Sequence, residues 1–170
     1  MQTVVRKIRW LVAITLLVSI AACSDNADLA NRPSSKDVTV EKISLDVYKS
    51  PTCGCCGKWV THVEASGFET AVHHPVNLNQ LKSDRGISPR YQSCHTAVSN
   101  NGYVFEGHVP ADVIQRFLTN PPPNAIGLAV PGMPVGSPGM EMGSRHDEYD
   151  VLLLNKDGSD AVYEHIGGNN

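Results

Sequence analysis

The sequence lacks the motifs that mark several large enzyme classes. It has no GxGxxG segment after a predicted strand, no P-loop, no HExxH and no GxSxG. These absences leave nucleotide-dependent, zinc-protease and esterase functions without support.

The sequence also has no apolar run long enough to span a bilayer comfortably. Its main apolar run extends from Trp10 to Ala22, directly after the basic residues Arg6, Lys7 and Arg9. This combination predicts a signal peptide over residues 1–22 and therefore a periplasmic location.

The end of this segment suggests a lipid anchor. Ile20-Ala21-Ala22-Cys23 resembles the lipobox of bacterial lipoproteins, which implies cleavage before Cys23, acylation of that residue and attachment to the outer or inner membrane. The alternative is ordinary secretory cleavage, which would leave Cys23 as an odd, unpaired thiol in an exported chain.

The chain after residue 22 has no cluster of basic residues. Cleavage after residue 22 removes three of the 14 Lys and Arg residues and none of the 17 acidic ones, so the formal net charge of the remainder is about −6. This charge argues against nucleic acid as a partner, because phosphate binding needs clustered Lys and Arg. Nor is there a long hydrophobic stripe, so we expect a monomer.

Two regions follow the signal peptide. Residues 23–37 are polar and lack apolar periodicity, which predicts a tether. Residues 38–170 are long enough to form the core of one small domain.

Apolar periodicity divides this domain into strands and helices. The expected strands cover residues 43–48, 68–72, 96–99, 103–108, 149–154 and 161–166, and Asn100-Asn101-Gly102 predicts a hairpin turn. The expected helices cover residues 57–65, residues 78–85 and a segment opened by Pro110. This order resembles a thioredoxin-like α/β domain, in which helices flank a mixed central sheet. A Met-, Gly- and Pro-rich loop over residues 131–142 and a C-terminal hairpin are additions to that fold.

Three thiols within four residues, Cys53-Gly54-Cys55-Cys56, lie where the first strand gives way to the first helix, and Cys94 lies in a second turn-like segment. A helix N-terminus favours thiolates, and Cu(I) prefers thiolate and thioether donors. Cys55 and Cys56 are adjacent and pair with each other only under strain, whereas both can reach a metal. The pattern favours a metal site.

Disulfide chemistry is the alternative, because the periplasm is oxidising and Cys53 with Cys56 is an obvious redox pair. Thioredoxin-type exchange sites have a cis-proline before the third strand, however, and this chain has Ser93-Cys94-His95 there, with Pro89 too early. Zinc is less favoured, since closed zinc sites usually take two well-spaced pairs of cysteines.

A closer resemblance is carried by four segments: Pro51-Thr52-Cys53-Gly54-Cys55-Cys56, Ser93-Cys94-His95-Thr96, Glu106-Gly107-His108-Val109-Pro110 and the loop from Pro131 to Glu141. Together they resemble the CopG-type periplasmic copper-resistance proteins. The resemblance implies a thioredoxin-like domain that binds copper at a multinuclear, thiolate-bridged site, either as Cu(I) or as a mixed-valence cluster. It also implies a role in handling copper or changing its oxidation state, alongside other periplasmic copper-resistance proteins.

Further ligand candidates are histidines and methionines. His95 adjoins Cys94 and His108 ends a predicted strand, and the resemblance favours both as ligands beyond what their spacing indicates. Methionines usually fill cores, but Met133 and Met140 lie among Gly and Pro, so we expect them to be thioether ligands or to shield the site, with Met142 a weaker candidate.

Overall fold

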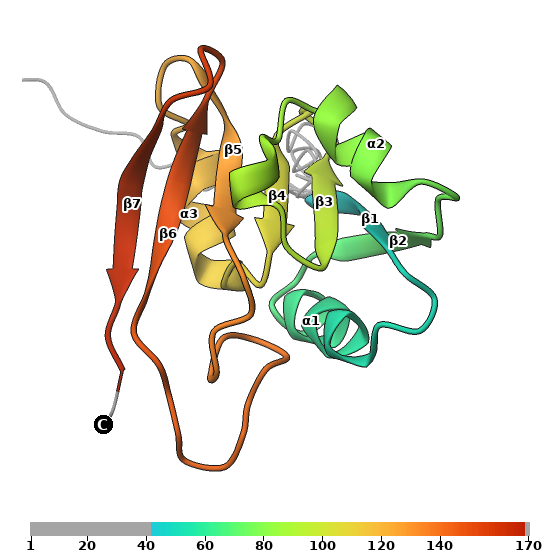
Figure 1. The fold of residues 1–170 in the computed structure, drawn as a ribbon, viewed down its shortest axis with the longest axis vertical. Helices are drawn as coiled ribbons and strands as arrows, with labels where there is room; N and C mark the ends of the chain where they lie inside the picture. Colours follow the sequence, from blue (N-terminus) through green and yellow to red (C-terminus); the bar gives the residue numbers. More distant parts are fainter. Residues whose placement is uncertain (1–41, 169–170) are drawn as a thin grey trace, which may run out of the picture. The chain divides into compact units, whose positions relative to one another are not determined.

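A seven-stranded mixed sheet forms the centre of the computed structural model, which describes residues 42–168 (Figure 1). The expected signal peptide, Cys23 and the tether lie outside the described residues. Across residues 42–168, no helix has both the length and the apolar character needed to cross a membrane.

The described residues form seven strands, three helices and one short 3-10 turn. The strands are β1 (Ser44–Lys49), β2 (Glu69–His73), β3 (His95–Ser99), β4 (Val104–Gly107), β5 (Ala125–Val130), β6 (Tyr149–Asn155) and β7 (Asp160–Ile166). The helices are α1 (Gly54–Ala65), α2 (Leu78–Asp84) and α3 (Ala111–Thr119), with a short 3-10 turn, η1 (Pro89–Tyr91).

The strands lie in the order β2-β1-β3-β4-β5-β6-β7. The β1–β2 and β4–β5 pairs are parallel, and the other four pairs are antiparallel. The parallel β1–β2 pair confirms the expected crossover through α1, and β6 and β7 extend the sheet as the C-terminal hairpin was expected to do.

Side chains that alternate along the strands build a core on each face of the sheet. Ala97 and Phe105 point into the larger core, which α1 and α3 cover with residues such as Trp59 and Phe117. Their neighbours on the strands face the second core, beneath the segment that contains Ile87 and η1.

Two elements differ from the sequence-based expectation. Helix α1 begins at Gly54, three residues earlier than expected, so Cys55 and Cys56 are helical. Strand β5 was not predicted, because its sequence Ala-Ile-Gly-Leu-Ala-Val does not alternate and follows three prolines. Strand β5 is buried on both faces, with Leu128 and Val130 in the larger core and Ala129 in the second core, and its sequence is therefore a nearly continuous apolar run.

Candidate metal centre

The first turn of α1 brings three cysteines together. Cys53 is the N-cap residue, and its sulfur accepts a hydrogen bond from the backbone N–H of Cys56 at 3.3 Å. Cys53 and Cys56 form a disulfide, with their Cα atoms 5.4 Å apart. Cys55 is a free thiol whose Sγ lies 3.5 Å from Sγ of Cys53. The pair named above as the redox alternative is therefore oxidised here.

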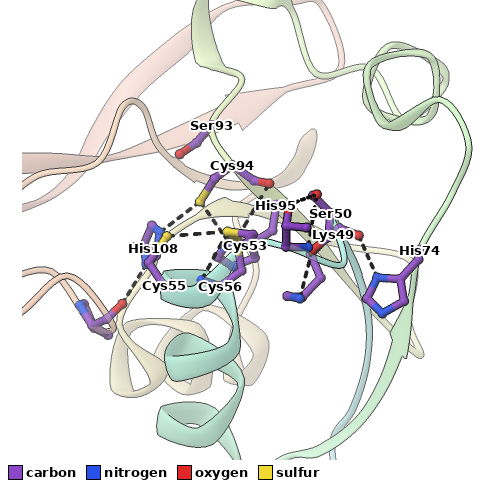
Figure 2. Close-up of a disulfide and its surroundings, with 12 residues drawn as sticks. Lys49, Ser50, Cys53, Cys55, Cys56, His74, Ser93, Cys94, His95 and His108 are labelled. Atoms are coloured by element: carbon purple, nitrogen blue, oxygen red, sulfur yellow. Dashed lines mark hydrogen bonds between the residues drawn. A yellow bond between two sulfur atoms is a disulfide. The ribbon is translucent and has the colours of Figure 1, made fainter.

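Cys94 reaches this turn from the segment that precedes β3. Strand β1 ends at Lys49, which pairs with His95, so the segment after β1 and the start of β3 lie at the same end of the sheet. The four sulfur atoms of Cys53, Cys55, Cys56 and Cys94 all lie within 4.8 Å of one another. Figure 2 shows Cys94 facing the three cysteines of the turn.

His108 lies on the other side of Cys94, at the end of β4. Its Nε2 atom is 2.9 Å from Sγ of Cys94, and its Nδ1–H donates a hydrogen bond of 2.7 Å to the carbonyl of Pro138 (Figure 2). That bond leaves the lone pair of Nε2 directed at the sulfur. A second hydrogen bond of this kind commonly fixes the ring orientation and tautomer of metal-binding histidines.

His95 is completely buried beside the same sulfur. Its Nδ1 atom lies 3.4 Å from Sγ of Cys94, and its ring packs on that of Trp59. Nε2 of His95 has no hydrogen-bond partner, and it is the only such buried side-chain nitrogen or oxygen within residues 42–168. A buried nitrogen without a hydrogen-bond partner destabilises the fold, and this atom is therefore available to coordinate a metal ion.

Burial keeps these groups uncharged in the metal-free protein. It raises the pKa of Cys94 to about 11, with the Cys55 thiol acting in the same direction. Burial also lowers the pKa of His108, and it lowers that of His95 well below the usual value. At neutral pH the Cys94 thiol therefore donates to a neutral His108, and metal binding would release the thiol proton.

The loop between β5 and β6 closes one side of the site. Gly139, with φ of +85°, packs so tightly on α1 that an added Cβ would lie 2.6 Å from the carbonyl oxygen of Cys55. This contact brings the Pro138 carbonyl to His108. The part played by Pro138 was not predicted, because it uses a main-chain carbonyl that has no signature in the sequence.

The predicted methionine ligands lie in the same loop. Met133 is 53% exposed and Met142 is 65% exposed, whereas Met140 is partly buried next to Gly139. Their role as thioether ligands stays a prediction.

The donor set fits a soft metal. The described residues contain two groups of potential ligands: the four cysteines, and Cys94 with His95 and His108. Neither group includes a carboxylate, and thiolate with imidazole is a set that Cu(I) and zinc accept but magnesium and calcium do not.

Comparisons with known proteins agree with this chemistry. A family profile described as "Protein of unknown function, DUF411" matches residues 91–140, which include Cys94, His108 and the first part of the loop, from Pro131 to Met140. No curated protein matches. Two solved structures are similar: "Copper resistance protein copG- Form 2", at 41% identity, and "Copper resistance protein copG- Form 1", at 42%. Each match has a TM-score of 0.71 and covers 75% of this chain and 100% of the other. The chain therefore belongs to the CopG family of copper resistance proteins.

Proposed function

We propose that this protein binds copper, principally Cu(I), in the periplasm and takes part in copper resistance. One observation carries the proposal: Cys94 belongs to both groups of potential ligands, with three sulfurs on one side and two imidazoles on the other. The names of the similar copper resistance proteins point to the same metal.

The shared sulfur also supports a multinuclear site. A thiolate can bridge two metal ions, and Cys94 lies where a copper held by the turn of α1 and a copper held by His95 and His108 would meet. The free thiol of Cys55 adds a second soft donor at this point. The neutral imidazoles are already in the protonation state that metal binding requires.

The fold assignment in this proposal is thioredoxin-like. Its support is the order β2-β1-β3-β4, in which β2 is parallel to β1 and the other two pairs are antiparallel. Strands β5 to β7 would then be an extension of that domain. The signal peptide and the lipidation of Cys23 remain part of the proposal on the sequence motifs alone.

Redox conversion of copper belongs to the proposal as well. Oxidation of the Cys53 and Cys56 thiols to the disulfide releases two electrons and two protons, and the electrons would reduce two Cu(II) to two Cu(I). The disulfide between these residues supports this step. It equally favours a second function, a thiol-disulfide oxidoreductase that acts on protein cysteines.

Copper stoichiometry separates the two functions. The chain carrying Cys23→Ser would be reduced, loaded with Cu(I) without oxygen, desalted and assayed for metal and free thiol. We expect two or more coppers per chain with the thiols protected, and loss of copper in Cys94→Ser. One copper or none, together with protein-disulfide reductase activity that needs only Cys53 and Cys56, would establish the oxidoreductase instead.

A further inference from the structure

A buried ion pair lies next to the Cys94 segment. Lys82 of α2 and Glu106 of β4 are in hydrogen-bonding contact, and their side chains are 1% and 0% exposed. Every other ion pair among residues 42–168 has side chains at least 33% exposed. Charges are rarely buried so completely, so this pair calls for an explanation.

The pair binds both polar groups of one peptide segment. Nζ of Lys82 donates to the carbonyl of Ser93 at 2.8 Å, and Oε1 of Glu106 accepts from the Ser93 N–H at 2.6 Å. The hydroxyl of Thr96 donates to Oε2 of Glu106 at 2.6 Å, which fixes the carboxylate from β3. Ser93 is thus held at its N–H and its C=O, and the next residue is Cys94.

Stability alone does not account for this arrangement. An apolar pair of the same size is often as stabilising as a buried ion pair, or more so, because neither charge has to be removed from water. An apolar pair, however, could not bind the main chain of Ser93. The residue must be held because Cys94 lies in a connecting segment, outside the regular hydrogen bonds of β3.

We infer that Lys82 and Glu106 are positioning residues for Cys94. By holding both main-chain groups of Ser93, they keep the Cys94 sulfur between the thiol turn of α1 and His108. This inference rests on the proposed copper function, because it explains how the sulfur shared by the two groups of ligands is fixed in place.

The test replaces both charges at once, so that neither is left unpaired. Lys82→Met/Glu106→Leu is compared with Arg116→Met/Glu164→Leu, which removes an ion pair between α3 and β7. In the metal-free protein we expect the NMR order parameter of the Cys94 amide to fall from about 0.85 toward about 0.6 in the first variant only. Its thermal midpoint should fall less than that of Lys82→Met alone, because no charge is left unpaired. An unchanged order parameter at Cys94 would overturn the inference.

Cu(I) affinity gives the second readout, measured by competition with a chromophoric chelator. We expect Lys82→Met/Glu106→Leu to lose roughly 10–100-fold in affinity, as for other residues that orient metal ligands. In a Cys94→Ser background the same change should cause no further loss, because the pair acts through Cys94. Additive losses would refute the inference.

Failure of the copper function itself would look different. If the unaltered protein binds no Cu(I), the proposed function is wrong, and the order parameter alone decides the positioning role. If the double variant does not fold, Thr96→Val takes its place. It releases one carboxylate oxygen of Glu106 without removing a charge, and we expect a smaller change in the same direction. No change at Cys94 would again count against the inference.

Discussion

Gly139→Ala tests whether the loop between β5 and β6 orients His108. In the present structure an added Cβ would lie 2.6 Å from the carbonyl oxygen of Cys55 and 2.9 Å from the backbone nitrogen of Trp59. Both atoms belong to the backbone of α1, which cannot easily yield. The first distance is about 0.7 Å short of the ~3.3 Å at which a carbon and a carbonyl oxygen normally lie. The loop must therefore move away from α1.

The expected loss in free energy of unfolding has two contributions. Alanine in a left-handed conformation costs about 1–2 kcal/mol, of which about 0.4–1 kcal/mol is offset by the stiffer unfolded chain. Displacement of the loop also breaks the 2.7 Å bond from His108 to Pro138, which leaves a buried donor unpaired at a cost of about 1–3 kcal/mol. We expect Gly139→Ala to lower the free energy of unfolding by about 1–5 kcal/mol in total, with a central value of about 3 kcal/mol.

Gly132→Ala is the matched control. Gly132 lies in the same loop with φ of +72°, and an added Cβ would meet nothing within 4 Å. The variant Gly132→Ala should lower the free energy of unfolding by only about 1 kcal/mol. Urea unfolding with the disulfide intact measures both values, and the ring ¹⁵N shifts of His108 report whether Nδ1 keeps its proton. Equal losses in the two variants, with an unchanged His108 tautomer, would refute the coupling.

Three further predictions concern stability. Lys82→Met alone leaves the Glu106 carboxylate buried without a counter-charge, so urea unfolding should show a loss of about 3–5 kcal/mol. Lys82→Met/Glu106→Leu should lose less, about 1–3 kcal/mol, because it leaves only neutral hydrogen-bonding groups of Ser93 and Thr96 without partners; equal losses would contradict this. Burial, aided by two neighbouring carboxylates, raises the pKa of Tyr149 to about 12. The folded protein then retains a proton that the unfolded chain loses near pH 10, so the free energy of unfolding should decline between about pH 10 and pH 12. This decline should be smaller in Tyr149→Phe. Identical alkaline unfolding curves for the two proteins would show that Tyr149 does not cause the decline. Trp59→Phe removes the 2.9 Å hydrogen bond from Nε1 to the carbonyl of Val109, and should cost at least about 1–3 kcal/mol in the same urea assay; a loss well below that range would indicate that the carbonyl finds another partner.

Most of the fold could be predicted from local pattern. Alternation located β1, the helix stop at Gly67 located β2, and turn residues located the two hairpins, β3–β4 and β6–β7. The start of α1 was missed by three residues because Cys53 caps the helix, and cysteine is not among the usual N-cap residues. Strand β5 was missed because both of its faces are buried in a core, which removes the alternation on which strand prediction depends.

The candidate site could be predicted only where side chains carry the chemistry. The thiols stand out in the sequence, whereas the resemblance to CopG-type proteins was needed to favour His95 and His108 among seven histidines, and the structure brings both sets of side chains together around Cys94. The contacts that hold them were invisible, because the carbonyl of Pro138 and both main-chain groups of Ser93 are available at almost any residue. The same holds for Lys82, whose burial depends on a partner 24 residues away.

The parallel pairing of β4 and β5 has an architectural consequence. Because α3 carries the chain back before β5 begins, Val130 at the end of β5 pairs with Gly107, next to His108. If β4 and β5 formed an antiparallel hairpin instead, the loop between β5 and β6 would lie at the opposite end of the sheet. The crossover instead brings the loop between β5 and β6 to the end of the sheet where His108 and Cys94 lie. Loops of other lengths and ligands could therefore be exchanged between Val130 and Tyr149 without redesigning strands β1 to β4, which position the thiol segments.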